Sequence, residues 1–442
     1  MGKVRREEAR RQRRAVAGFD LVFTPVSSVS RLWGLDPRGW VREAVEAAHC
    51  AARDASLGLL EEHAAFTRTG SSGQAQIETR GLVAAVFEHA DNRLGEPNLH
   101  SHVAVSSKVL GVDGKWRALD ARGLYRMAVA ASELYNTRLE HELQARLGLE
   151  FEARADTVGG REPVREIKGF PPEVLAYFTR RRAGIEGEYA RLVAGFRAVH
   201  GRDPSLAAAH ALAQQATLST RSGKKPPRAW SAMRQQWRAE LADRFGSGAL
   251  ARVMAVVPAR RGRGGSAPVS GAQVDVAAIA SRVVGAVQEH HATWTRWSVL
   301  AQAQRELRGV WFGTAGEQER AVAQVVEAAL AVWSVPVEPP DLLAEPAGLR
   351  RADGSSVFTQ HGAARFTSRA VLDAEARLVE AAGTATTVGV DGPTAAAALT
   401  AYERTSGRAL DPGQRALVEA FACDGRLLLA GIGPAGAGKT TA

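Results

Sequence analysis

Cysteine is almost absent from this chain of 442 residues, which contains only Cys50 and Cys423. The two lie far apart and in no metal-ligand spacing, which excludes a disulfide framework and a cysteine zinc site and fits a reducing cytoplasm. No run reaches about 18 uninterrupted apolar residues, so we expect no transmembrane helix. The charged N-terminus does not lead into the apolar core of a signal peptide. We therefore expect a cytoplasmic protein without membrane insertion.

Tyrosine is absent from the first 124 residues, and the first one in the chain is Tyr125. Residues 1–17 are rich in arginine instead, with seven basic and two acidic side chains. Arg, Glu and Ala favour a helix, but this segment has no apolar stripe to bury. We expect a solvated or DNA-contacting arm at 1–17 rather than a part of the core.

Acidic residues are too few to balance the basic ones. There are 47 Asp and Glu against 57 Lys and Arg, which gives a net charge of +10. A basic surface is expected for a partner that carries phosphates. The 45% hydrophobic fraction is ordinary for a globular protein, and the length suits two or three domains.

The strongest chemical signal lies in Phe87–Lys108, FEHADNRLGEPNLHSHVAVSSK. Leu99–Leu110 alternates in polarity, and successive strand residues point to opposite faces. His100 and His102 should therefore share one face, together with Ala104, Ser106 and Lys108. His89, on the preceding strand, supplies a third imidazole. Three imidazoles without an obvious fourth protein ligand leave open positions on a metal, as catalytic sites do. The alternative is a solvated hairpin with unrelated polar residues.

A second candidate site residue lies on the strand expected at Gly18–Thr24. Phe19, Leu21 and Phe23 should lie on one face of this strand and Asp20 on the other. A carboxylate among apolar neighbours needs a partner, because burying it unpaired is costly. The alternative is an aspartate at a strand edge, in solvent.

Two amphipathic helices and a linker follow from periodicity and composition. Apolar residues recur at helical spacing over 41–59 and again over 124–143, where Tyr135 falls in the apolar stripe and is expected to pack. Residues 151–245 are expected to be helical and basic. Arg260–Gly271, RRGRGGSAPVSG, has the composition of a linker. Helices are expected again at 276–287, 299–307 and 366–382.

The C-terminal segment carries a nucleotide-binding motif. GPAGAGKT at 433–440 satisfies the phosphate-loop pattern directly after the apolar run RLLLAGI at 426–432, which predicts a buried strand. Backbone N–H groups would cradle phosphates, the lysine would reach the terminal ones, and the threonine would ligate Mg²⁺. Because the chain ends two residues later, we expect an incomplete ATP site. The candidate nucleotide-binding residues are Gly433, Gly436, Gly438, Lys439 and Thr440.

Several blocks in this order resemble conjugative relaxases of the MobF class, the TrwC/TraI-like relaxase-helicases. Beside the phosphate loop, the resemblance rests on HADNRLGEPNLHSH, GFDLVFTPVSSVSRLWGL at 18–35, WRALD at 116–120, ASELYNT at 131–137 and QQATLSTR at 214–221. It implies an α/β fold in which a relaxase (HUH-endonuclease-like) core has a central antiparallel sheet with flanking helices. A helical accessory region and the start of a P-loop helicase domain would follow.

The resemblance also implies roles for single residues. His89, His100 and His102 would hold a divalent cation, Mg²⁺, Mn²⁺ or Zn²⁺, which polarises a scissile DNA phosphate. Asp20 would orient a histidine and act as a catalytic residue. In the family, residues 151–245 close over the DNA strand. The candidate DNA contacts are Lys108, Arg221, Lys224 and Lys225, and Gln414 resembles the adenine-sensing glutamine of related helicases.

The expected partners are single-stranded DNA at a transfer origin and the coupling and accessory proteins of conjugation. In the family, a tyrosine ahead of the first strand attacks the phosphate and stays linked to the 5′ end. No tyrosine precedes Asp20 here, so we expect a relaxase truncated at both ends that binds metal and DNA but does not nick by itself. The alternatives are a non-catalytic DNA-binding fragment and a metal-dependent hydrolase that uses water.

The expected domain order is a basic arm at 1–17, a relaxase core at 18–245 and a linker at 246–275. A helical accessory region of the helicase is expected at 276–385, and a truncated P-loop domain at 386–442.

Overall fold

The computed structural model describes residues 16–154, 162–223, 226, 228–258, 273–338, 345–386 and 388–432. The arm at 1–15, the two lysines Lys224 and Lys225, and the phosphate loop at 433–440 lie outside the described residues. Within the described residues, no helix is long and apolar enough to span a membrane.

A three-stranded antiparallel sheet forms the centre of the N-terminal half. Its order is β1 (Gly18–Phe23), β5 (Pro97–Ser106) and β4 (Ala84–Asp91). The register places Val22 of β1 and Phe87 of β4 on either side of His102, and pairs His89 with His100. The antiparallel sheet predicted from the sequence is present, and its middle strand carries the HxH pair.

The expected strand at 99–110 is shorter than predicted. β5 ends at Ser106, and Lys108 begins a separate strand, β6 (Lys108–Leu110), which pairs with β7 (Trp116–Ala118). Gly18 on β1 and Ala84 on β4 are the last partners of β5 at this end. Beyond them the chain bends and finds a different strand to satisfy its backbone groups.

Three helices cover one face of the sheet: α2 (Ser27–Leu35), α3 (Gly39–Ala64) and α4 (Arg122–Leu147). The alternate residues of β5 that face them are buried, and Val103 lies in one apolar core with Val45 of α3 and Leu139 of α4. Both long helices extend beyond the predicted ranges, because polar end turns lack the apolar signal that marks the middle. The opposite face of the sheet carries the histidines.

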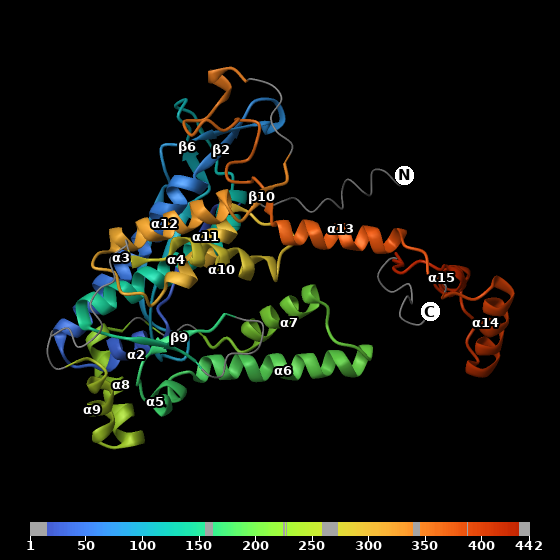
Figure 1. The fold of residues 1–442 in the computed structure, drawn as a ribbon. Helices are drawn as coiled ribbons and strands as arrows, with labels where there is room; N and C mark the ends of the chain where they lie inside the picture. The colour runs from blue at the N-terminus through green and yellow to red at the C-terminus, as the bar shows by residue number, and fades with distance from the viewer. Residues whose placement is uncertain are drawn as a thin grey trace, which may run out of the picture.

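Two further hairpins flank this body, so the region from 151 is not purely helical. They are β2 (Phe66–Thr69) with β3 (Ala75–Glu78), joined through the 3₁₀ turn Ser71–Gly73, and β8 (Phe151–Ala153) with β9 (Arg165–Ile167). The helices that follow are α5 (Pro172–Tyr177), α6 (Arg180–His200), α7 (Leu206–Ser219), α8 (Trp230–Phe245) and α9 (Gly248–Ala255). Figure 1 shows α6 and α7 side by side, reaching away from the body.

The linker predicted to begin at residue 246 does not begin there. Gly248–Ala255 forms α9, and Ala249, Val253 and Val257 are buried in the same core as the sheet. Ala249 and Val253, four residues apart, give this short helix an apolar face, so it packs against α8 and α2 instead of spanning solvent.

A three-helix bundle follows the core and packs against it. α10 (Val276–Gln288), α11 (Arg296–Leu307) and α12 (Ala315–Ala331) enclose a second apolar core. Trp297 and Ala301 of α11 belong to the first core, and α11 lies along α4. The bundle is thus joined to the body rather than held apart from it (Figure 1).

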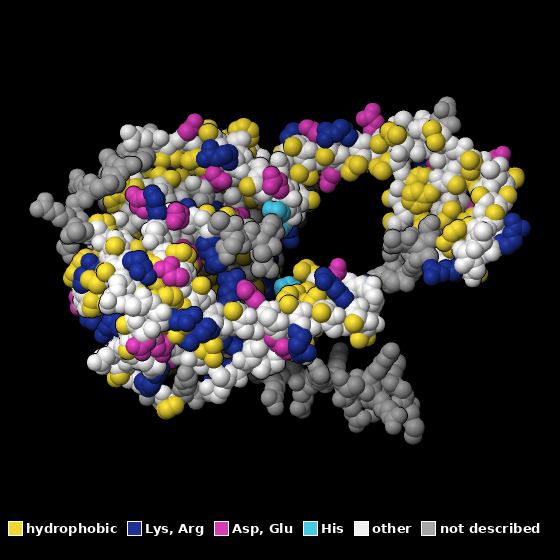
Figure 2. Space-filling model, turned by 90° about the horizontal axis from the view of Figure 1, so that it is seen from below, with side chains coloured by type: hydrophobic (Ala, Val, Ile, Leu, Met, Phe, Trp, Pro, Cys, Tyr) yellow, Lys and Arg dark blue, Asp and Glu magenta, His cyan; other side chains and the backbone are white. Residues whose placement is uncertain are grey.

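The C-terminal elements begin on the body, where Phe366 bridges Trp294 and Arg351 donates to Gln76, and they end in a lobe formed by the last two helices (Figure 1). β10 (Val335–Pro336) pairs with β11 (Phe366–Thr367), and the turn Ala347–Leu349 lies between them in sequence. α13 (Arg369–Gly383) then leads to α14 (Gly392–Ser406) and α15 (Pro412–Cys423). Figure 2 shows hydrophobic side chains gathered on the α14–α15 lobe.

The buried strand predicted at 426–432 is not present. This run forms no strand within the described residues, and Leu427 and Ile432 are exposed, Ile432 at 97%. An apolar run becomes a buried strand only where neighbouring strands supply backbone partners. Among the described residues, only an isolated bridge between Arg426 and Ala385 does so.

Candidate metal centre

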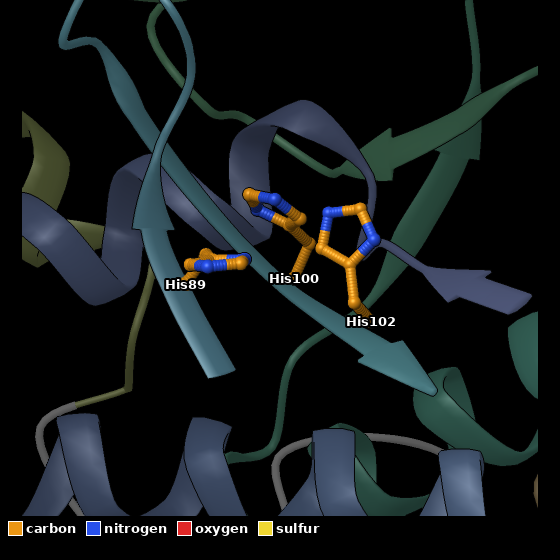
Figure 3. A group of neighbouring side chains, drawn as sticks. All are labelled: His89, His100 and His102. Carbon is orange, nitrogen blue, oxygen red and sulfur yellow. The ribbon is translucent and has the colours of Figure 1, made fainter. Parts of the chain in front are cut away.

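The open face of the central sheet brings three imidazoles together. One ring nitrogen from each of His89, His100 and His102 lies within 4.8 Å of the others, and the ring centroids are 5.1–5.2 Å apart. Figure 3 shows the three rings converging from the adjacent strands β4 and β5. His89 is exposed and the other two are half-buried. The register, which pairs His89 with His100 across the strands, produces this convergence.

Asp20 holds the ring of His102. Both carboxylate oxygens of Asp20 lie 2.9 Å from Nδ1 of His102. The two residues meet because Val22 faces His102 on the sheet and Asp20, two residues away, points to the same side. With Nδ1–H donating to the carboxylate, Nε2 of His102 is left as the ligand atom.

A backbone carbonyl holds His100 in the same way. Its Nδ1 lies 2.8 Å from the backbone carbonyl oxygen of Asn98 and 3.1 Å from Nδ2 of the Asn98 side chain. Burial lowers the pKa of His100, and the neighbouring imidazoles of His89 and His102 lower it further, against the raising effect of the Asn98 carbonyl. The ring is therefore neutral at physiological pH, the state in which imidazole binds a metal.

Beneath the metal-facing side lies a buried hydrogen-bond chain that sequence reasoning missed. His49 of α3, 1% exposed, contacts the Tyr135 hydroxyl at 2.8 Å and the Ser101 hydroxyl at 2.6 Å. Ser101 in turn donates to Glu88 at 2.8 Å, and Glu88 pairs with Arg53. His49 thus ties the helix layer to β4 and β5, directly behind the histidines.

A cleft of about 550 Å³ opens beside the three histidines, at the end of the hairpin where β4 turns into β5. Arg93 of the β4–β5 loop, Arg181 of α6 and Arg228 ahead of α8 line it. Arg181 also donates to the carbonyls of Thr217 and Thr220 at the end of α7. The basic clusters at 180–182 and 224–228 are visible in the sequence, and of their described residues the fold brings Arg181 and Arg228 to the cleft.

Glu96, fully buried, fastens this loop to α6. Its carboxylate accepts hydrogen bonds from the backbone N–H groups of Arg180 and Arg181, at 2.9 and 3.2 Å, and from the Arg180 side chain. Burial raises its pKa, but the hydrogen bonds from Asn92, Arg180 and Arg181 outweigh burial and leave the pKa below its usual value. Trp237 of α8 adds a bond to the Gly95 carbonyl, 2.7 Å.

The remaining described candidates are not part of the histidine cluster. Lys108 is exposed on β6 in a different sheet. Arg221 is exposed just after α7, next to Ser222, which donates to the Arg93 carbonyl at 3.0 Å. Gln414 takes part in the capping box of α15, where its side-chain oxygen accepts from the Asp411 N–H at 3.1 Å. Lys224, Lys225, Lys439 and the rest of the phosphate loop lie outside the described residues, as noted above.

The tyrosines lie apart from the histidines. Tyr135 is buried in the core, and burial raises its pKa well above the usual value, so its phenol stays protonated. Tyr125 is 73% exposed, but its ring packs edge-on against Phe19, on the helix-covered side of β1. All five tyrosines of the chain fall in the described residues, and none of them lines the cleft.

An antiparallel sheet that gathers three imidazoles beside an arginine-lined cleft is typical of a protein that binds a divalent metal and a phosphate-bearing ligand. The model of the TrwC relaxase family matches residues 2–244, more than half of the chain. The chain therefore belongs to the TrwC relaxase family.

Curated relatives agree with this family. The chain is 31% identical over 185 residues to the multifunctional conjugation protein TraI of Escherichia coli strain K12, and 29% identical over 185 residues to a second Escherichia coli protein of that name. Each match covers 40% of this chain and 10% of the relative. The matched part thus spans about a tenth of the length of these relatives.

Solved structures of similar sequence include the conjugative relaxase TrwC in complex with oriT DNA. A copper-bound form is 26% identical and covers 55% of this chain and 75% of that one, with a TM-score of 0.43. A metal-free form is 26% identical, with coverage of 54% and 77% and the same TM-score.

Proposed function

We propose that this chain is the DNA- and metal-binding part of a conjugative relaxase. It would hold single-stranded DNA at a transfer origin for site- and strand-specific nicking by transesterification. The observation that carries the proposal is the convergence of His89, His100 and His102, with Asp20 bonded to His102. Membership of the relaxase family supports the same class of reaction.

The residues present fit a divalent metal. Asn98 and Asp20 engage Nδ1 of His100 and His102, so the two Nε2 atoms remain as ligands beside a nitrogen of His89. Of the metals expected, three imidazoles suit Zn²⁺ best and Mg²⁺ least, because Mg²⁺ prefers oxygen ligands. When bound, the metal would supply a Lewis acid for a phosphate oxygen.

The protein's own groups would orient the DNA. Asp20 keeps the His102 ring in one tautomer and one orientation, and the Asn98 carbonyl does the same for His100. Arg93, Arg181 and Arg228 line the adjoining cleft, where phosphates next to the scissile one would lie. Asp91, which also lines the cleft, pairs with Arg228 at 3.5 Å and offsets part of this positive charge. On the face shown in Figure 2, basic and acidic side chains are interspersed, so the cleft rather than a broad patch is the proposed DNA site.

Calorimetry tests the metal site. Titration of the 442-residue protein with Zn²⁺ or Mn²⁺ should show one site that a His100→Ala, His102→Ala double variant loses. The matched control is His290→Ala, His291→Ala, which removes two adjacent exposed histidines outside any described cluster. Undiminished binding in the first variant would remove the basis of the proposal.

DNA binding and cleavage need a second experiment. The logarithm of the affinity for single-stranded DNA should fall linearly with the logarithm of the salt concentration. An affinity that does not change with salt would point to a protein partner.

Denaturing electrophoresis of labelled DNA distinguishes the possible reactions. A protein adduct on the 5′ end indicates a relaxase, free ends a hydrolase, and intact DNA a binding module. Because no tyrosine lines the cleft, we expect binding without an adduct from this polypeptide.

We also propose that residues 386–442 open a helicase domain. The phosphate-loop motif at 433–440 and Gln414 support this proposal. A fluorescent ATP analogue tests it: we expect little binding by the 442-residue protein and no ATP turnover. Turnover above background would contradict the expected incomplete site.

A further inference from the structure

The open face of the central sheet continues past the histidines as an apolar surface. Cross-strand partners share a face, so the row at His102 also presents Val22 of β1 and Phe87 of β4. The next row presents Asp20, Ala104 and Ala85. Rows are two strand residues apart, about 7 Å, and strands lie about 5 Å apart. Phe87 is therefore an immediate neighbour of the metal-facing imidazoles.

Phe87 and Val22 are exposed to an unusual degree for apolar residues at the centre of a site. Phe87 is 55% exposed and Val22 is 51% exposed. No aromatic ring of the described residues stacks on Phe87. In the neighbouring row, the side chains of Ala85 and Ala104 are too short to cover its ring. An exposed aromatic ring on a flat surface gains stability when another planar group covers it.

Charge and geometry indicate what would cover it. The arginine-lined cleft meets the histidines at the hairpin end of β5. Phe87 lies one row further from that end, beside His102, so His89 and His100 stand between Phe87 and the hairpin end. A ligand that lies in the cleft and crosses the histidines therefore needs negative charge for the arginines and a flat apolar group for Phe87. Single-stranded DNA has both, since its phosphates alternate with planar bases. Its bases stack on aromatic side chains whatever their sequence.

We propose that Phe87 is the stacking platform for one nucleobase of the bound strand, next to the phosphate that lies at the histidines, with Val22 forming the apolar edge beyond His102. This inference rests on the proposed DNA-binding function. It assigns Phe87 a positioning role: a base fixed on its ring limits how the adjoining phosphate can move relative to His89, His100 and His102.

The test uses 2-aminopurine, a fluorescent base that stacking quenches, moved one position at a time through a fixed single strand. With the 442-residue protein we expect quenching centred on one position. Phe87→Ala should remove that quenching and weaken binding about 5- to 150-fold, the range for loss of one base stack. Phe87→Tyr should preserve both. An abasic site at the quenched position should make wild type and Phe87→Ala bind equally.

The matched control is Val86→Ala. Val86 is the preceding residue of β4, is 43% exposed, and pairs with the buried Val103, so it points to the other side of the sheet. It should leave quenching and affinity unchanged. Zn²⁺ calorimetry on Phe87→Ala, expected to match wild type, shows that the hairpin is intact.

The outcomes separate this inference from the proposed function. DNA binding in which Phe87→Ala changes neither quenching nor affinity overturns the platform and leaves the proposed function standing. No DNA binding by the wild type overturns the proposed function itself. Concentration-dependent dimers that dissociate in Phe87→Ala would mean that another protein strand, rather than a base, covers this edge of the sheet, and would also overturn the inference.

Discussion

At the scale of single residues, the candidate metal centre is defined by which nitrogen of each ring is already engaged. Asp20 and the Asn98 carbonyl take the Nδ1 atoms of His102 and His100, and so direct both Nε2 atoms outward. Among the described residues, none engages a ring nitrogen of His89 in this way, and His89 is the most exposed of the three. The outer groups that orient a ligand ring are as much a part of a metal site as the ligands.

Replacing Asp20 by Asn should weaken metal binding about 10- to 100-fold, because the amide holds the His102 ring less firmly and no longer favours one tautomer. The fold should be unaffected, since the Asp20 side chain is 59% exposed. Zn²⁺ calorimetry and a thermal melt measure the two effects. Asp203→Asn, at a 73% exposed carboxylate paired with Arg197, is the control. An unchanged Zn²⁺ affinity in Asp20→Asn would show that the carboxylate does not orient the ligand.

At the scale of elements, the β4–β5 loop is held by helices that follow it by some eighty residues or more. Glu96 accepts the first backbone N–H groups of α6, and Trp237 of α8 donates to Gly95. A carboxylate at a helix N-terminus is stabilised by the unsatisfied N–H groups and by the helix dipole. The position of α6, and with it Arg181 beside the cleft, therefore depends on one buried side chain of the metal-site hairpin.

Replacing Glu96 by Gln should destabilise the protein by roughly 1.5–3 kcal/mol, the value of hydrogen bonds to a charged group. Hydrogen exchange at the Arg180 and Arg181 amides should speed up with it. Glu173→Gln, which alters an exposed ion pair with Arg252, should do neither. Equal protection of the two amides in Glu96→Gln and wild type would contradict the anchoring role.

The contribution of the Glu96 carboxylate to the stability of the fold should decrease in acid. The folded-state pKa of Glu96 lies below the usual value of about 4.3. The folded state then binds fewer protons than the unfolded state, so the contribution is full above that usual value and is lost as pH falls through the folded pKa. Acid melts of Glu96→Gln should lack this component.

At the scale of the whole molecule, ion pairs hold the segments after residue 258 on the sheet domain. A loop at residues 345–365, here called the returning loop, also contacts this domain. Glu133 of α4 binds Arg305 at 2.9 Å and also Arg308, both beyond the helices of the sheet domain. Arg351 donates to the backbone and side-chain oxygens of Gln76 on β3, at 3.1 Å each. Motion of the downstream elements would therefore be transmitted to the sheet domain.

Replacing Glu133 by Gln should cost about 3 kcal/mol, because the largely buried Arg308 loses its counter-charge, whereas Arg305 keeps an ion pair with Glu162 at 3.1 Å. Glu142→Gln is the matched control on the same helix. Glu142 also pairs with two arginines, Arg138 and Arg146, but at helical spacing within α4, where such pairs are worth a few tenths of a kcal/mol each. Only the Glu133 variant should raise hydrogen exchange in α11, and a rise in both would refute the contact's docking role.

Docking of the returning loop should weaken in mild acid. His361 stacks on His63, with parallel rings 5.7 Å apart, and lies 3.1 Å from Asp353. Burial lowers the pKa of both histidines; Asp353 raises that of His361 and Glu62 that of His63, without outweighing burial. The folded state thus binds fewer protons near pH 6, and its stability falls as pH drops below the usual histidine pKa of about 6.5.

The measurement is hydrogen-exchange protection of the Gln76 amide, which donates to Val357 of the loop at 2.7 Å. Protection should decrease between about pH 7 and pH 5 in wild type. It should stay level in a His63→Phe, His361→Phe variant, which keeps the stacked rings but not the charge. A decrease that persists in that variant would place the pH response elsewhere.

Local pattern was sufficient for much of the fold. The alternation after Leu99 predicted β5 and the shared face of His100 and His102, because a strand's side chains alternate whatever packs on them. Apolar spacing predicted α3 and α4, although their ends lay outside the apolar stripe. The exposed run at 426–432 shows the limit of such a pattern, since hydrophobicity alone does not supply neighbouring strands.

Spacing along one hairpin was therefore enough to predict the three histidines of the candidate metal centre. What surrounds them depends on the tertiary fold. Asp20 reaches His102 from a strand 82 residues away in sequence, and Glu96 reaches the α6 N-terminus from 84 residues away. Which arginine of a basic cluster lines the cleft depends on how α6 and α8 are anchored. Such contacts depend on burial and register across the whole molecule, and no local period in a sequence encodes them.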